Sequence, residues 1–380
     1  MYQLTEQQQH LDQVLTWMER VDRFGIDTEF IKVDTLWPKL GVLQLNVDQK
    51  VVLLDGIQLN LQPIWQKMFD AKQTVFHACG EDIDLIYHYA KQTNLNNVFD
   101  TQVAMAFLGH GLQVSYQNAL KQILDIEIEK DQTRSNWLAR PLSDEQLSYA
   151  ANDVVYLMDL ADQLQAQLID KNLYSAVLED CQSWTTEIGQ QTEAALLYTD
   201  VANYRHYPRQ LIQLQQLALW RDEMIKTHNV PKSFVLKNSS LLDLVEKNPK
   251  NNYQLAQVKD IRPNVVREHG KTILALLKDL PDESQWPKRL LKPVKQASVE
   301  IQEQVNAVIQ EARQRTDVPT DVLMRKKWMQ AMYQHVVFGH DIETLPSYLL
   351  GWRYDLLTAP IVELLQQDVK FLSKQMLRGG

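Results

Sequence analysis

Asp27 and Glu29 lie two residues apart in an apolar segment that contains Phe24, Ile26 and Phe30. If this segment is a strand, both carboxylates point to one face, because side chains alternate between the two faces. Adjacent like charges raise each other's pKa, so such a pair usually binds a cation. Carboxylate oxygens are hard ligands that suit Mg²⁺ or Mn²⁺. The pattern indicates a divalent-metal site, although a solvated strand face could carry the same two acids.

Two other positions could contribute to the same chemistry. Tyr149 and Asp153 lie four residues apart and therefore share one face of a helix. A carboxylate with a phenol one turn away can hold a metal and a water together; an ordinary helix with a half-buried Tyr is the alternative. Asp82 follows residues 77–81, where a short strand meets a helix. Its carboxylate could face a cleft at the sheet edge or simply cap the helix.

The hydrophobic pattern predicts the elements that hold these residues. Strands are expected at residues 24–30, 39–47 and 51–54, as a meander, and at 74–76; helices are expected at 4–21, 59–69 and 81–91. This mixture indicates an α/β or α+β domain around a central mixed sheet.

Beyond about residue 100 the pattern is helical to the end of the chain. Ser143 and Gln146 form a capping-box signature for a helix that contains Tyr149 and Asp153. Asp100 is a candidate N-cap for a helix that begins at the next residue. Proline-containing segments at residues 205–208 and 280–293 indicate linkers, and helices are expected at 299–316 and 323–337. The two helical segments could be diverged copies of one module.

Length and composition bound the architecture and the compartment. A chain of 380 residues indicates two or three domains. The net charge of −9 divides into −16 for residues 1–200 and +7 for residues 201–380. An acidic half could hold metal ions while a basic half binds phosphates, unless both are simply solvated surfaces.

The cysteine content, the apolar runs and the N-terminal residues indicate the cellular compartment. Cys79 and Cys181 are the two cysteines, which argues against a disulfide framework. No apolar run approaches the roughly 18 residues that span a bilayer. The N-terminus lacks the basic and apolar blocks of a secretory signal. We therefore predict a cytoplasmic protein without a membrane partner.

As a set, Asp27-x-Glu29, Asp82 and Tyr149-x-x-x-Asp153 resemble, in order and spacing, the motifs of the DEDDy 3′→5′ exonucleases. Over residues 20–165 the chain is similar to the ribonuclease D family in particular. The stretches that carry this similarity are Trp37-Pro38-Lys39-Leu40, His77-Ala78-Cys79-Gly80-Glu81-Asp82, Phe99-Asp100-Thr101-Gln102 and Trp137-Leu138-Ala139-Arg140-Pro141-Leu142. Downstream, residues 217–223, 231–237 and 265–270 resemble an HRDC module (helicase and RNase D C-terminal), and residues 349–353 resemble a second, more diverged one.

The resemblance implies an architecture. An α/β ribonuclease H-like exonuclease domain, with a mixed sheet flanked by helices, would occupy residues 1–195. Two all-α HRDC-type domains would follow at residues 205–285 and 295–375.

The resemblance also implies a mechanism. Asp27, Glu29, Asp82 and Asp153 would hold two divalent cations, Mg²⁺ or Mn²⁺, about 4 Å apart, and Tyr149 would orient the attacking water. Nucleoside 5′-monophosphates would leave one at a time from the 3′ end. The expected substrates are structured RNAs with a 3′ single-stranded end, such as tRNA precursors. We expect a monomer without an obligate protein partner.

Several residues are candidate contacts to the nucleic acid. Trp137 and Arg140 could stack on the RNA or clamp it, or could merely anchor their loop. His77 could contact substrate, but a local hydrogen bond explains it as well. The full set of candidates is Thr28, His77, Trp137, Arg140, Lys232, Lys237, Arg267 and Lys271.

Two rival functions remain open at this point. The same carboxylates would cut DNA, and selectivity for RNA depends on contacts to the 2′-hydroxyl that a sequence does not display. A catalytically silent RNA-binding adaptor is the second rival. The complete acidic set with Tyr149 argues against it, because a silent copy has no physical reason to keep a costly acidic cluster.

Overall fold

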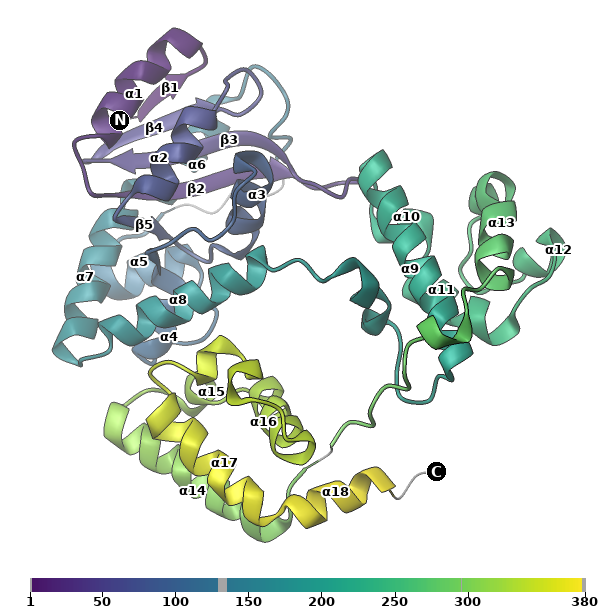
Figure 1. The fold of residues 1–380 in the computed structure, drawn as a ribbon. Helices are drawn as coiled ribbons and strands as arrows, with labels where there is room; N and C mark the ends of the chain where they lie inside the picture. The colour runs from purple at the N-terminus through teal and green to yellow at the C-terminus, as the bar shows by residue number, and fades with distance from the viewer. Residues whose placement is uncertain (1, 129–134, 295, 378–380) are drawn as a thin grey trace. The chain divides into compact units, whose positions relative to one another are not determined.

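The computed structural model describes residues 2–128, 135–294 and 296–377 (Figure 1). The chain forms two compact units. The first comprises Met1–Ile31, Lys39–Gln190 and Val294–Gly380, and the second comprises Lys32–Pro38 and Gln191–Pro293. Each unit has its own hydrophobic core. The third predicted domain therefore shares a core with the predicted exonuclease domain, and the boundaries at residues 195, 205, 285 and 295 stay a prediction.

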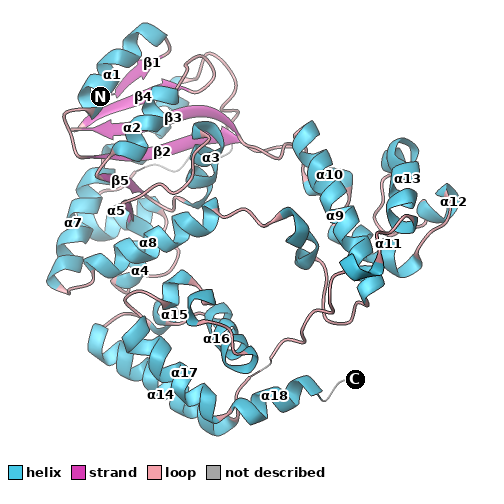
Figure 2. Cartoon of the chain, viewed as in Figure 1, coloured by secondary structure: helices cyan, strands magenta, loops and turns pink. Residues whose placement is uncertain are grey.

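A mixed six-stranded sheet forms the centre of the first unit, with strand order β1-β4-β3-β2-β5-β6 (Figure 2). The strands are β1 Tyr2–Thr5, β2 Arg23–Ile31, β3 Lys39–Val47, β4 Lys50–Asp55, β5 Gln73–Phe76 and β6 Val98–Asp100. The predicted meander is confirmed, because β2, β3 and β4 pair in antiparallel fashion. The outer strands β1, β5 and β6 pair in parallel with their neighbours.

One predicted helix boundary is wrong. The spacing of apolar residues favoured a helix from residue 4, but Leu4 lies in β1 opposite Leu53 of β4. The helix itself, α1, covers only Leu11–Met18. Leu4 and its neighbours fit either pattern locally, and pairing with a strand distant in sequence decides between them. The same reason explains why the short strand β6 was not predicted.

Helices pack around the sheet and complete this part of the first unit. They are α2 Gln62–Asp70, α3 Gly80–Ala90, α4 Thr101–Phe107, α5 Tyr116–Leu124, α6 Asp144–Val155, α7 Leu157–Asp170 and α8 Tyr174–Gly189, with a short turn at Gln8–His10. The capping box that begins α6 is confirmed, because Ser143 and Gln146 exchange side-chain-to-backbone hydrogen bonds of 3.2 and 3.1 Å. Asp100 caps α4 as expected and also accepts hydrogen bonds from the amides of Ala78 and Cys79.

A C-terminal helical module, Val294–Leu377, completes the first unit. Its helices are α14 Val299–Thr316, α15 Thr320–Leu323, α16 Lys326–Phe338, α17 Ala359–Gln367 and α18 Val369–Leu377, with short turns at Ile342–Thr344, Ser347–Leu349 and Tyr354–Thr358. The helix expected at residues 323–337 is interrupted, because Met324 and Arg325 have an extended backbone between α15 and α16. The module packs against α8 through Ser347–Leu349.

The second unit is all-helical in its described residues. Its elements are α9 Pro208–His228, α10 Lys232–Val235, α11 Asn238–Lys247, α12 Asn252–Leu255 and α13 Pro263–Lys278, with short turns at Ala194–Asp200 and Glu283–Gln285. Arg221 is buried in this unit and donates to the Leu236 carbonyl at 3.1 Å and to Asn238 at 2.8 Å. Across the described ranges of the chain, no helix combines the length and apolar character needed to cross a bilayer.

Candidate active site

Asp27 and Glu29 lie on β2, between β3 and β5 in the sheet. They pair with Gln44 and Val42 of β3, and the register shifts directly after Glu29. Phe24 and Ile26 are buried in the core, as their apolar character predicted. The strand therefore presents both carboxylates to a single open cleft, in agreement with the prediction.

Helix α6 brings Asp153 to this pair. The side-chain amide of Asn46, on β3, donates to the carbonyl oxygens of Val154 and Val155 at 2.9 and 3.2 Å. These two bonds hold the end of α6 against the sheet beside β2. As a result, one ligand oxygen each from Asp27, Glu29 and Asp153 lies within 4.8 Å of the other two.

Asp82 also lines this cleft, from its place in the first turn of α3. It is buried, and its carboxylate accepts a hydrogen bond from the hydroxyl of Thr28. Asp82 is not among the three acids whose oxygens cluster within 4.8 Å. Thr28, predicted to contact nucleic acid, is itself buried with its hydroxyl on Asp82, and its contact with nucleic acid stays a prediction.

The electrostatics of the cleft favour a bound cation. Burial, and then the charges of Asp82, Asp153 and Glu29, raise the pKa of Asp27 well above its ordinary value. Burial, and then the charges of Asp153 and Asp82, raise the pKa of Glu29 to about 9. Burial also raises the pKa of Asp153 and of Asp82, against the lowering effect of the Thr28 hydrogen bond on Asp82. A cation would relieve this repulsion.

The residues fit a divalent metal ion. The cleft has a volume of about 440 Å³, and no lysine or arginine is found among its described lining residues. The Oδ2 atom of Asp153 is buried and has no hydrogen-bond partner within the described structure. An unpartnered buried carboxylate oxygen is costly unless something binds it. Several carboxylate oxygens facing one space match the ligand preference of Mg²⁺ or Mn²⁺.

Tyr149 lies one turn before Asp153 on α6 and lines the cleft. Its ring packs against that of Trp137, with centroids 6.1 Å apart. Burial and the neighbouring carboxylates raise the pKa of Tyr149, so its phenol keeps its proton at neutral pH. A protonated phenol beside the carboxylates can donate a hydrogen bond to Asp153 or to a water.

The prediction that Trp137 stacks on RNA is wrong, and for Arg140 the contact with RNA stays a prediction. Trp137 is only 2% exposed, so its ring offers no face to a base. The guanidinium of Arg140 donates to both oxygens of buried Asp55, at 2.6 and 2.9 Å, and to the Gly41 carbonyl at 2.8 Å. Both residues anchor their loop to the sheet, which is the alternative that the sequence left open.

His77 lines the cleft, but both of its ring nitrogens are engaged. They contact the Thr101 hydroxyl at 2.8 Å and the Val114 carbonyl at 2.9 Å. Burial lowers the pKa of His77, which favours the neutral ring. These local hydrogen bonds account for His77, and its contact with substrate stays a prediction.

Sequence reasoning missed Tyr116. This residue begins α5, lines the cleft and packs on His77 with centroids 5.4 Å apart. Its hydroxyl is buried without a hydrogen-bond partner in the described structure. A tyrosine after a helix N-cap carries no signal of its own, and only the fold places it beside the carboxylates.

The basic candidates lie in the second unit. All four are exposed: Lys232, Arg267 and Lys271 lie on its helices, and Lys237 lies directly before α11. Lys232 lies 3.8 Å from Asp200, and Arg267 contacts the adjacent Glu268 at 3.0 Å. Exposed ion pairs of this kind hold their partners weakly, so these cations stay accessible to phosphates. Their contact with nucleic acid stays a prediction.

Comparison with known proteins defines the class first. Residues 2–169 match the family model of a 3′-5′ exonuclease, and residues 210–277 match that of an HRDC domain. The mixed sheet with its acidic cleft and the helical unit after it are therefore those of a 3′-5′ exonuclease that carries an HRDC domain.

Whole-chain similarity then defines the family. Ribonuclease D of Pseudomonas paraeruginosa is 30% identical to this chain, over 90% of this chain and 92% of that protein. Ribonuclease D of Haemophilus influenzae is 29% identical, over 87% and 84% of the two chains. The crystal structure of Escherichia coli RNase D superposes with a TM-score of 0.90 and 23% identity, over 97% and 99%. The chain belongs to the ribonuclease D family, and it is an exoribonuclease.

Proposed function

We propose that this exoribonuclease trims the 3′ ends of structured RNAs, such as tRNA precursors, by hydrolysis that depends on two divalent cations. Asp27, Glu29, Asp82 and Asp153 would hold the cations, and nucleoside 5′-monophosphates would be the products. The observation that carries the proposal is the approach of oxygens from Asp27, Glu29 and Asp153 to within 4.8 Å of one another. The participation of Asp82 rests on its place in the same cleft.

The chain's own residues have distinct tasks in this scheme. When bound, divalent cations lower the pKa of water and neutralise the charge that develops on the phosphate. Asp27, Glu29 and Asp153 position the cations, and Thr28 holds Asp82 in its orientation. Tyr149 keeps its proton and orients the attacking water through its hydroxyl. The absence of lysine and arginine among the described lining residues leaves charge neutralisation to the cations.

The choice of substrate rests on the relatives. Escherichia coli RNase D, whose fold this chain shares, is described as an exoribonuclease involved in structured RNA processing. We propose that Lys232, Lys237, Arg267 and Lys271 of the helical unit contact the phosphates of such an RNA, since exposed cations bind the backbone without regard to sequence. We also propose the boundaries 1–195, 205–285 and 295–375 for the three domains, and a monomeric state.

The test compares the wild-type protein with Asp27→Asn on two substrates: a tRNA with a short 3′ extension, and a single-stranded DNA of the same extension sequence. Each is incubated with Mg²⁺, with Mn²⁺ or with EDTA. Asp12→Asn is the matched control, because Asp12 is an exposed acid on α1 of the same unit. We expect the wild type and the control to shorten the RNA to mononucleotides, and EDTA or Asp27→Asn to abolish the reaction.

The other outcomes identify the rivals. Faster shortening of the DNA would make this chain a DNA exonuclease. Equal RNA binding by wild type and Asp27→Asn, without shortening by either, would leave the silent adaptor.

A further inference from the structure

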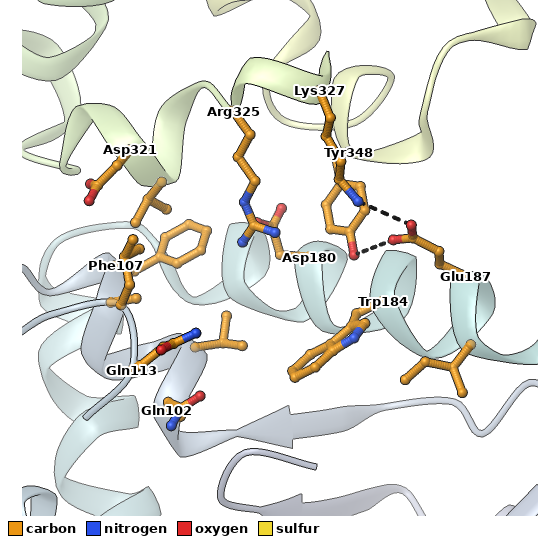
Figure 3. A pocket seen from close by; sticks show the side chains of 15 residues that line it. Gln102, Phe107, Gln113, Asp180, Trp184, Glu187, Asp321, Arg325, Lys327 and Tyr348 are labelled. Carbon is orange, nitrogen blue, oxygen red and sulfur yellow. Dashed lines mark hydrogen bonds and ion pairs between the residues drawn. The ribbon is translucent and has the colours of Figure 1, made fainter. Parts of the chain in front are cut away.

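A second groove lies in the first unit, where the C-terminal module faces the exonuclease domain (Figure 3). Its volume is about 630 Å³, larger than that of the carboxylate cleft. Helices α4 and α8 form one side, and α15 with the start of α16 forms the other. We call it the junction groove and define it by Gln102, Gln113, Trp184, Arg325, Lys327 and Tyr348.

The acids on the α8 wall of the junction groove are already neutralised. Both oxygens of Asp180 accept hydrogen bonds from buried Arg353. Glu187 pairs with Lys327 at 3.1 Å and accepts a hydrogen bond from Tyr348 at 3.3 Å, as the dashed lines in Figure 3 show. Because each carboxylate is paired with a cation, Asp180 and Glu187 should repel an anionic ligand only weakly.

Of the two cations among the described lining residues of the junction groove, Lys327 is paired with Glu187, and the other is Arg325. Its side chain is exposed and extends from the C-terminal module toward α8 (Figure 3). Its guanidinium lies 5.0 Å from the ring centroid of Trp328 and 5.9 Å from that of Tyr348. No carboxylate lies within ion-pair distance of it in the described part of the chain. Asp321 is an exposed acid at the opposite end of the groove from Trp184 in Figure 3.

The groove also has a flat surface and amide groups. Trp184 of α8 is half-buried and lines the groove with its indole. Gln113 is exposed, and Gln102 uses its amide nitrogen on the Val114 carbonyl, which leaves its oxygen as an acceptor. An aromatic ring, a guanidinium and side-chain amides together suit a base, a phosphate and the polar edge of the base.

The junction groove adjoins the wall of the carboxylate cleft. A methyl group on Gly80 would lie 2.9 Å from Cζ2 of Trp184, and Gly80 stands two residues before Asp82 on α3. The carbonyl of Val114 accepts from Gln102 on the groove side and contacts His77 on the cleft side. A ligand in the groove would therefore be a close neighbour of the catalytic carboxylates.

We propose that the junction groove binds one nucleotide unit, with its base on Trp184 and its phosphate on Arg325. The unit could be a free nucleoside 5′-monophosphate or one nucleotide of an RNA chain, and both present the same chemistry to the groove. The inference rests on the proposed function in one respect. In that function RNA is the substrate and a nucleoside 5′-monophosphate is the product, so both forms of the ligand would be present near the groove.

The experiment measures nucleotide binding in EDTA, which removes the divalent cations and so prevents hydrolysis in the carboxylate cleft. Full-length protein is titrated with 8-azidoadenosine 5′-monophosphate, and separately with a 12-residue oligoadenylate carrying the same azido base, and is then photo-crosslinked and digested. We compare wild type with Arg325→Ala and with Lys326→Ala as the matched control, because Lys326 is an exposed neighbouring cation that does not line the groove. Thermal unfolding of each variant checks that the fold is retained.

We expect crosslinks in α8 or in residues 321–327, and a loss of affinity of about tenfold or more for Arg325→Ala, as for a charge-assisted contact to phosphate. Lys326→Ala should change affinity less than about twofold. An effect on the mononucleotide identifies a free nucleotide as ligand, and an effect on the oligoadenylate alone identifies the RNA chain.

Equal affinities of the Arg325 and Lys326 variants for both probes, or crosslinks confined to the carboxylate cleft, would overturn the proposal. Failure of the proposed function is a separate result. It would be seen as a wild-type protein that shortens no RNA with Mg²⁺ or Mn²⁺, whatever the junction groove binds.

Discussion

Arg353 and Asp180 join the C-terminal module to helix α8 through a buried ion pair. Arg353 is 0% exposed and Asp180 is 5% exposed. The guanidinium also donates to the carbonyls of Val322 and Leu323 at 2.8 and 3.0 Å and lies 4.2 Å from the ring centroid of Trp352. The guanidinium therefore donates both to Asp180 of α8 and to backbone carbonyls of the C-terminal module. The pair lies where the module and the exonuclease domain share their hydrophobic core.

Removing one partner of this pair should destabilise the protein. We expect Arg353→Met to lower the free energy of unfolding by about 3–5 kcal/mol, because it leaves the Asp180 carboxylate buried without its cation. Urea unfolding of the two proteins measures the difference. The double variant Asp180→Leu/Arg353→Met should recover much of the loss. A loss below about 1 kcal/mol would contradict the role given to the pair.

Thr28→Val tests whether Thr28 orients Asp82 or contacts RNA. The substitution keeps the shape of the side chain and removes the hydroxyl that donates to Asp82. Because partners behind a metal ligand tune its affinity, we expect activation by Mn²⁺ to require about 10–100-fold more metal. RNA binding measured in EDTA should not change. An altered RNA affinity with unaltered metal dependence would instead support the prediction that Thr28 contacts RNA.

Tyr149→Phe removes only the hydroxyl that is assigned to the attacking water. The ring can still pack on Trp137, so the fold should be retained. We expect the single-turnover rate to fall by about 100-fold or more, as for a lost proton-transfer or positioning group. Metal binding measured by calorimetry should stay within about twofold of the wild type. A large loss of metal affinity would instead make Tyr149 part of the metal site.

Asp153→Asn should separate activity from stability. The change removes one of the charges that raise the pKa of Asp27 and Glu29. In EDTA we therefore expect a higher melting temperature than that of the wild type, by roughly 2–4 °C for each kcal/mol of relieved repulsion. Hydrolysis of RNA should fall below detection. A lower melting temperature in EDTA would show that the acids do not repel one another as described.

The stability of the metal-free protein should depend on pH with a definite sign. Glu29 has a pKa of about 9 in the folded chain, raised from 4.5. Between those values the folded state holds a proton that the unfolded state has lost, so stability falls as pH rises. We expect the melting temperature in EDTA to decline from pH 5 to pH 9. Glu29→Gln should flatten this decline.

Adding Mn²⁺ should reverse the decline. Metal binding requires deprotonated ligands and stabilises the folded state that it binds. The rise in melting temperature on adding Mn²⁺ should therefore grow from pH 5 to pH 8. A rise of equal size at all pH values would mean that the acids in the cleft are already ionised without metal.

The sequence by itself determined the local arrangement of the residues that we propose carry the chemistry. Asp27 and Glu29 share a strand face because they are two residues apart, and Tyr149 and Asp153 share a helix face because they are four apart. The capping box at Ser143 and the N-cap at Asp100 likewise depend on neighbours within three residues. Such relationships follow from backbone geometry alone and hold in any context where the element forms.

Only the tertiary structure decided how these pieces meet. The Asn46 amide, 108 residues from its partner Val154, holds α6 beside β2 and so places Asp153 on the Asp27–Glu29 pair. The pairing of Arg140 with Asp55, 85 residues away, likewise could not be read from the local sequence. Burial and long-range pairing depend on residues that are remote in the chain. No local pattern contains that information, and packing of the whole core supplies it.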